Sequence, residues 1–262
     1  MHEDRKPPLD TEGLDRYVRQ MILPGIGREG QKKLKASRVL VAGIGGLGSL
    51  SSLYLCAAGI GHLAIVDAGR VQASDLNRQL LYDEKDIGEP KVIAANKRLS
   101  GMNSDVEVIS VFEEIKEETV AELLNGIDIV VDGTDNFRTR FILNRACYQG
   151  KIPFVYGGIF GLKGSVTTVI PGQTPCLKCF ITKDEETRLP IPAIGPIVGM
   201  IATIQAMEVL KLILHLGELL AGELLLLDGG KMSFRKMAIK KREDCVVCSC
   251  SEKLPKQGKM SC

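Results

Sequence analysis

The sequence predicts an α/β fold whose central sheet begins parallel and continues into antiparallel strands. Short β-branched runs alternate with helical patterns early in the chain, and a glycine-rich turn links the first strand to a helix. Two later strands are separated only by the glycine-rich stretch GGIFGLKG, which favours a turn over a crossover helix. The length of 262 residues favours one α/β domain with an appendage, which we place over residues 1–250.

In the first half, apolar spacing predicts each element in turn. An amphipathic helix over 10–23 stops before Pro24, and a lysine-rich helix over 27–36 leads into a strand over 38–42. That strand is short, apolar and β-branched, as strands buried on both faces are. The elements expected after it are a helix over 47–58, a strand over 61–66, a helix over 90–99, a strand over 106–111, a helix over 116–124, a strand over 127–131 and a helix over 137–148.

In the second half, alternating patterns predict strands over 153–156 and 166–170 on either side of the GGIFGLKG turn. An irregular stretch over 172–193 precedes a long apolar helix over 196–216. The final elements are a hairpin and a tail: strands over 223–228 and 233–239 around Gly229 and Gly230, then residues 251–262, which we expect to be disordered.

The glycine turn after the first strand has the spacing GxGxxG, formed by Gly43, Gly45 and Gly48 with Gly46 inside it. Glycine lets backbone N–H groups approach a phosphate, and the following helix adds the positive end of its dipole. Asp67 ends the next strand, where a carboxylate can accept hydrogen bonds from ribose hydroxyls. The pattern predicts a Rossmann-like nucleotide site and leaves a dinucleotide or ATP as the ligand.

Composition excludes several classes of protein. The chain is 45% hydrophobic and 25% charged, as globular proteins are, and its net charge of +2 gives no support for a nucleic-acid partner. The start, MHEDRKPPLD, lacks the apolar stretch of a secretory signal, so we expect a cytoplasmic protein. Residues 189–207 carry no charge, but three prolines and the nearby Glu208 and Lys211 favour a buried helix over a membrane span.

Four of the eight cysteines fall in two CxxC pairs, Cys176 with Cys179 and Cys245 with Cys248. Each CxxC turn places two thiolates on one side of a metal, so two such pairs complete a tetrahedral zinc site. A thioredoxin-like redox motif explains only one pair. We therefore expect structural Zn²⁺ bound by all four cysteines, joining residues 172–193 to the C-terminal segment.

Polar side chains gather where the second and fourth predicted strands end. Parallel strands end at one edge of the sheet, where open α/β sheets bind ligands. Acids there can hold Mg²⁺, and cations can neutralise charge on a transferred phosphorus. The alternative to a role in the site is that Arg78 or Lys91 is a solvated surface charge and that Asp132 caps the helix that follows it. The side chains are Asn77, Arg78 and Gln79 after the second strand, Lys91 at the next helix start, and Asp132 and Asp135 after 127–131.

The motifs RYVRQ, GIGGLG, SDLNRQ, GEPK, DGTDN and two CxxC pairs occur in this order between residues 10 and 248. In this the chain resembles the ThiF/MoeB/HesA family of ubiquitin-activating-like adenylyltransferases. The resemblance implies a homodimer with a mixed sheet, one ATP per subunit, and zinc away from the active site. It also makes residues 37–150 the nucleotide-binding half and 151–250 the half that binds a carrier protein and zinc.

The resemblance also implies roles for single residues. The glycine turn would bind the phosphates of ATP, Asp67 would bind the ribose, and cations and amides would contact the triphosphate. Asn136 would lie beside the nucleotide. Arg19 would reach into the site of the neighbouring subunit. Arg19 can also be an ordinary surface charge of a helix. The catalytic residues implied are Arg19, Arg78, Lys91 and Asp135, the last also binding Mg²⁺, and the nucleotide contacts implied are Gly43, Gly45, Gly46, Gly48, Asp67, Asn77, Arg78, Gln79, Lys91, Asp135 and Asn136.

The reaction implied is attack by a protein's C-terminal glycine carboxylate on the α-phosphorus of ATP, which releases pyrophosphate. The partner would be a small β-grasp sulfur carrier of the MoaD/ThiS type ending in Gly-Gly, in molybdenum cofactor or thiamine biosynthesis. Relatives that bind their carrier covalently have a cysteine before the long helix, and residues 181–194 contain none. We therefore expect a separate sulfurtransferase or cysteine desulfurase and a molybdopterin-type enzyme. Any sulfur-transfer role of Cys250 or Cys262 stays open.

Two interpretations from other classes compete. A nicotinamide-dependent oxidoreductase would account for GxGxxG and Asp67, but it leaves SDLNRQ, Lys91 and the zinc ligands unexplained. A non-catalytic scaffold would keep the fold and the zinc without turnover, although every charged side chain that the reaction needs is present. Within the family, a peptide or a tRNA is an alternative substrate. The sequence does not name the carrier.

Overall fold

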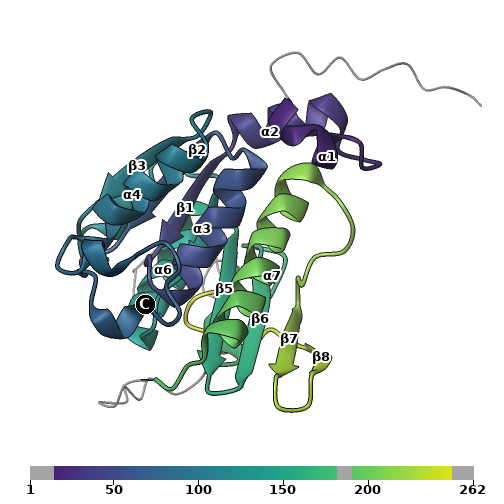
Figure 1. Cartoon of the computed structure of the whole chain (residues 1–262). Helices are drawn as coiled ribbons and strands as arrows, with labels where there is room; N and C mark the ends of the chain where they lie inside the picture. Colours follow the sequence, from purple (N-terminus) through teal and green to yellow (C-terminus); the bar gives the residue numbers. More distant parts are fainter. Residues whose placement is uncertain (1–14, 182–190, 250–262) are drawn as a thin grey trace, which may run out of the picture.

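The computed structural model describes residues 15–181 and 191–249. Its strands are β1 (Arg38–Ala42), β2 (His62–Val66), β3 (Glu107–Val111), β4 (Ile129–Asp132), β5 (Phe154–Phe160), β6 (Lys163–Val169), β7 (Glu223–Asp228) and β8 (Ser233–Ala238). They form one sheet in the order β3-β2-β1-β4-β5-β6-β7-β8 (Figure 1). Pairing is parallel from β3 to β5 and antiparallel from β5 to β8, which confirms the predicted mixed sheet.

Helices cover both faces of this sheet. The α-helices are α1 (Val18–Met21), α2 (Gly27–Ala36), α3 (Gly46–Ala58), α4 (Lys91–Met102), α5 (Val120–Leu123), α6 (Phe137–Gly150) and α7 (Gly195–Leu214), and the short 3₁₀ turns are η1 (Asp15–Tyr17), η2 (Ala73–Asp75), η3 (Glu84–Asp86) and η4 (Leu177–Cys179).

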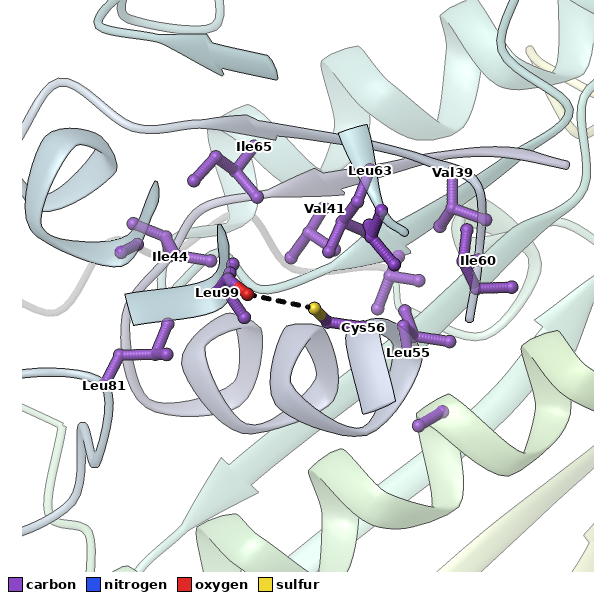
Figure 2. Packing of buried hydrophobic residues seen from close by; sticks show 14 of the residues in the cluster. Val39, Val41, Ile44, Leu55, Cys56, Ile60, Leu63, Ile65, Leu81 and Leu99 are labelled. Carbon is purple, nitrogen blue, oxygen red and sulfur yellow. Dashed lines mark hydrogen bonds between the residues drawn. The ribbon is translucent and has the colours of Figure 1, made fainter. Parts of the chain in front are cut away.

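β1 shows how the two layers of core are divided. Val39 and Val41 pack into the cluster that contains α3 and α4, whereas Leu40 and Ala42 face the cluster that contains α6. Figure 2 shows the first cluster, where the thiol of Cys56 donates to the carbonyl of Leu99 at 3.4 Å. Because successive strand residues point to opposite faces, one five-residue strand supplies both cores.

α7 packs against α3 and the face of β5 and β6 (Figure 1). It is long and apolar enough to cross a membrane, but half of its most apolar window is buried inside the protein. Two of its polar side chains are tied to the sheet. Gln205 donates to the carbonyls of Asp132 and Val155 at 2.8 and 3.1 Å, and Glu208 accepts from Thr168 at 2.6 Å. These contacts agree with the predicted buried helix.

Four predicted elements differ from the structure. The helix expected over 10–23 is, within the described residues, η1 followed by the single turn of α1, and the helix expected over 116–124 is only α5. The strands expected on either side of GGIFGLKG extend into it, so that β5 and β6 are joined by a tight turn at Gly161, whose φ is +60°. Residues 1–14, 182–190 and 250–262, including the predicted disordered tail and Cys250, lie outside the described residues.

Candidate functional site

A cavity of about 460 Å³ opens where β1, β2 and β4 end. Its wall includes the glycine turn after β1, Asp67 after β2 and residues 133–136 after β4. β1 lies between β2 and β4, and the chain crosses over in opposite directions on its two sides. Ligands bind to open α/β sheets at such a point. The cavity therefore occupies the position that the glycine motif predicted.

Gly43, Gly45 and Gly46 line the cavity, whereas Gly48 does not. Gly43 has a φ of +84°, a conformation that favours glycine. A Cβ on Gly48 would lie 1.8 Å from the carbonyl oxygen of Gly43. Gly48 thus allows α3 to pack closely on the turn.

Two side chains hold the glycine turn in place. Asp67, on the cavity wall, accepts from the backbone N–H of Ile44 at 2.9 Å and of Gly69 at 2.6 Å. Tyr82 is buried and donates its hydroxyl to the carbonyl of Ile44 at 2.7 Å. Burial raises the pKa of Tyr82, and the nearby carboxylate of Asp67 raises it further, so the hydroxyl stays a donor. Asp67 is therefore fixed before any ribose binds.

A cationic cluster forms another part of the wall, where Arg78, Gln79 and Lys91 surround the carboxylate of Asp75. Lys91 Nζ lies 3.3 Å from Asp75 Oδ2, and Arg78 Nη2 lies 3.6 Å from Asp75 Oδ1. Asn77 does not line the cavity, and its side chain accepts from Arg78 at 3.1 Å. Two of the three predicted side chains from SDLNRQ therefore face the cavity.

The loop after β4 rests on a buried ion pair. Arg140 Nε lies 2.9 Å from Asp132 Oδ2, and Arg140 Nη2 donates to the carbonyls of Thr134 and Gly157 at 2.6 and 3.1 Å. Thr134 donates twice to Asp132, at 3.0 and 2.7 Å. Burial disfavours the cationic form of Arg140, but the nearby groups, chiefly the carboxylate of Asp132, together outweigh this and raise the pKa of Arg140. The pair fixes the loop that carries Asp135.

Asp135 and Asn136 both lie on the cavity wall. Asn136 is the N-cap of α6, because its side chain accepts from the N–H of Thr139 at 2.9 Å. The alternative that Asp132 caps this helix is therefore wrong. Asp135 is exposed at the cavity, as an acid that binds a hydrated Mg²⁺ must be.

Among the polar residues that line this cavity, sequence reasoning missed six: Asp75, Glu113, Glu114, Thr134, Thr139 and Arg140. Asp75 lies in the motif SDLNRQ beside Arg78, and Thr134 lies in DGTDN beside Asp135. Their position next to predicted site residues in the sequence could have identified both of them. Arg140 lies eight residues after Asp132, and only the fold brings the two together. Arg19, predicted to act at a neighbouring subunit's site, is exposed on α1 and does not line the cavity of its own chain.

The four predicted zinc ligands come together. The sulfur atoms of Cys176, Cys179, Cys245 and Cys248 all lie within 4.8 Å of one another, and all four residues are buried. Cys176 is 3.5 Å from Cys245, and Cys179 is 3.3 Å from Cys248, between sulfur atoms. Tetrahedral Zn²⁺ with bonds of about 2.3 Å separates its sulfur ligands by about 3.8 Å, so the cluster fits zinc. No cysteine of the cluster lines the nucleotide cavity.

Known proteins resemble the chain over most of its length. It is 39% identical to "Protein HesA, vegetative" of Trichormus variabilis over 92% of this chain and 91% of that one. It is 40% identical to the sulfur carrier protein adenylyltransferase of Thermus thermophilus, over 90% and 91%, and to the SAMP-activating enzyme E1 of Haloferax volcanii, over 92% and 90%.

Among solved structures, E. coli MccB with ATP superposes with a TM-score of 0.74, covering 83% of this chain and 68% of that one, at 24% identity. This likeness shows a common fold. The sequence profile of the ThiF family matches residues 17–249, nearly everything that the structure describes. The chain therefore belongs to the ThiF family.

Proposed function

We propose that this protein is an ATP-dependent adenylyltransferase that activates the C-terminal carboxylate of a small ubiquitin-like sulfur carrier. The observation that carries the proposal is the wall of one cavity, which brings together a glycine turn, the acid Asp67 at the end of β2 and two cations. An oxidoreductase would need the first two but not the cations. The names of the Thermus and Haloferax relatives point to the same reaction.

The site residues divide the work on ATP. Asp67 would accept hydrogen bonds from the ribose, and the N–H groups of Gly45 and Gly46 with the N-terminus of α3 would face the phosphates. Arg78 and Lys91 would offset charge on the phosphates. Asp135 would hold Mg²⁺, which when bound neutralises the departing pyrophosphate.

The chemistry needs no proton transfer. An oxygen of the carrier's carboxylate forms a bond to the α-phosphorus as the bond from that phosphorus to the β-phosphate breaks, and the electron pair leaves with pyrophosphate. A C-terminal carboxylate is already ionised at neutral pH, so no general base is required. In agreement, none of the residues found in the cavity wall within the described part of the chain is a histidine. The catalytic task is to hold two anions in line and to offset their repulsion.

We also propose a homodimer in which Arg19 completes the partner's site. Arg19 is exposed on α1 and does not line the cavity of its own chain. Figure 1 shows α1 at the end of the sheet away from the carboxyl ends of β1, β2 and β4. The outer sides of α3 and α7 also carry exposed apolar residues, Tyr54 and Met207. Mixing Arg19→Ala chains with inactive Asp135→Ala chains tests this, because only heterodimers would regain one intact site.

We assign carrier docking to the antiparallel half. β8 is the edge strand of the sheet and is exposed along its whole length, including Phe234 and Met237. The neighbouring β5–β6 turn exposes Phe160 and Leu162. Exposed apolar residues beside an open strand edge are typical of protein-binding surfaces. Phe234→Ser should therefore raise KM for the carrier and leave ATP binding unchanged.

Sulfur delivery would fall to another protein, since residues 181–194 contain no cysteine. This favours a molybdopterin-type enzyme over a thiamine-type one. Mass spectrometry of the enzyme after incubation with ATP and carrier should find acyl-adenylate on the carrier and no covalent adduct between the two proteins. An adduct within residues 181–194 would refute this part of the proposal.

The deciding experiment is exchange of ³²P-labelled pyrophosphate into ATP with candidate carriers ending in Gly-Gly. Exchange should require the terminal glycine and should disappear in Asp135→Ala. A non-catalytic scaffold would show no exchange with any carrier and would be indifferent to that substitution. Tight binding of NADH together with no exchange would instead support an oxidoreductase.

A further inference from the structure

Asp75 is a buried carboxylate at the end of η2, with 6% of its surface exposed, and the roles proposed above leave it without a task. Its Oδ2 accepts from the backbone N–H of Gln72 at 3.1 Å and lies 3.3 Å from Lys91 Nζ. Its Oδ1 accepts from Gln79 Nε2 at 2.8 Å and lies 3.6 Å from Arg78 Nη2. One acid therefore touches both cations proposed to bind the phosphates.

The two cations need such an anchor. Lysine and arginine side chains lose rotamer entropy when they are fixed, and two like charges at one wall repel each other. Asp75 offsets that repulsion. Arg78 has further supports, since its Nη1 donates to the carbonyl of Ser74 at 2.6 Å. For Lys91, Asp75 is the acid that the structure brings within 4 Å of its ammonium group among the described residues.

The same carboxylate also opposes the ligand. A triphosphate placed on Arg78 and Lys91 would approach an acid of its own sign, which lines the same cavity. The negative charge of Asp75 would thus cancel part of the attraction between the two cations and the phosphates of ATP. We infer that Asp75 positions both phosphate-binding cations and that its negative charge weakens ground-state binding of ATP. This inference rests on the proposed function.

Two substitutions separate position from charge. Asp75→Asn removes the charge but keeps an oxygen for the N–H of Gln72, and its new amide group can donate to Gln79 Oε1, which is buried without a partner in the described structure. Asp75→Ala removes both the charge and the acceptors. The matched control is Asp86→Ala, because Asp86 occupies the same position in η3 and accepts from the N–H of Asp83 at 2.9 Å, outside the cavity wall.

The experiment measures the Kd of ATP by calorimetry at low and high salt, and kcat and KM for pyrophosphate exchange with a carrier. Asp75→Ala should lower kcat by about 100-fold, the cost of misplaced reacting groups, whereas Asp86→Ala should keep the wild-type kcat. Asp75→Asn should lower the Kd of ATP by about threefold at low salt, as expected for one partly screened charge. Salt should remove that difference.

Each result decides the matter. If Asp75→Ala keeps the kcat of the Asp86→Ala control, Asp75 does not position the cations. If Asp75→Asn binds ATP no more tightly than the wild type at low salt, its charge does not oppose the nucleotide. A wild-type protein that binds ATP and exchanges pyrophosphate while both variants match it overturns this inference alone. A wild-type protein that neither binds ATP nor exchanges pyrophosphate overturns the proposed function as well.

Discussion

Replacing Arg140 with methionine tests whether the buried ion pair under the DGTDN loop holds the site together. Arg140→Met keeps most of the side-chain volume but removes the guanidinium group that lies 2.9 Å from Asp132 and donates to two carbonyls. Removing one partner of a buried pair leaves the other charge without compensation, at a cost of about 3–5 kcal/mol. Thr134 still donates twice to Asp132, so we expect about 4 kcal/mol, near the middle of that range.

Urea unfolding followed by far-ultraviolet circular dichroism measures this loss. The chain has no tryptophan, so tryptophan fluorescence is not an option. Zinc and protein concentrations must stay fixed, since metal binding and self-association both shift apparent stability. Asp132→Asn should cost a similar amount, because it leaves the buried guanidinium group of Arg140 without its carboxylate. In the double variant, the two losses should fall well short of adding, because the residues are in direct contact.

A loss below about 1 kcal/mol for Arg140→Met would refute the reasoning, because that is the range of a solvent-exposed pair. Simple addition in the double variant would also refute it. We further expect the variant to lose pyrophosphate exchange at urea concentrations where it is still folded, since Asp135 depends on the loop that Arg140 fixes.

Three further predictions follow from the core and the cysteine cluster. Gly48→Ala should lower the free energy of unfolding by about 1–3 kcal/mol, because the new methyl group would overpack against Gly43. The control Gly101→Ala on α4 meets open space and should raise the free energy of unfolding by about 0.5 kcal/mol. Equal effects of the two substitutions in urea titrations would contradict this. A zinc chelator should lower Tm, and elemental analysis should find one Zn per chain. The Cys176→Ser variant should retain less zinc than the wild type, and an unchanged zinc content in that variant would contradict the site. Burial raises the pKa of Cys56 to about 11, so the folded chain keeps a proton that the unfolded chain releases. This contribution to the free energy of unfolding is fully present below about pH 9 and is lost as the pH rises towards 11. Cys56→Ala should therefore make the free energy of unfolding fall less steeply between about pH 9 and 11, by up to about 1.4 kcal/mol per pH unit. An unchanged slope in the variant would contradict this prediction.

The strands could be predicted because their signals are local. β1 matches its predicted range fully, since a β-branched apolar run between a helix and a glycine turn has few alternatives. The helix expected over 116–124 failed for an equally local reason. Thr119 accepts from the N–H of Lys116 at 3.1 Å and forms a turn, and the acidic stretch before it supplies few apolar side chains to hold a helix on the sheet. α5 begins only at Val120, which is buried.

The site could be predicted in part. Asp67, Arg78, Lys91 and Asp135 follow strand ends or begin a helix, and the topology then brings them to one edge. Asp75 and Arg140 could not be ranked in this way, since their importance comes from burial and from contacts that only the fold creates. A charged residue that is buried with a partner has the same letter in the sequence as one in solvent.

The cysteine cluster joins parts of the chain 69 residues apart, with β7 and β8 made between them. If a metal acts as other cross-links do, closing a loop of that length lowers the conformational entropy of the unfolded chain by an amount equivalent to about 4 kcal/mol at 25 °C. On the ribosome, the first CxxC pair emerges long before the second. The four cysteines therefore cannot come together until the end of the chain has been made, so a metal bound there would couple the C-terminal segment to the antiparallel half of the sheet.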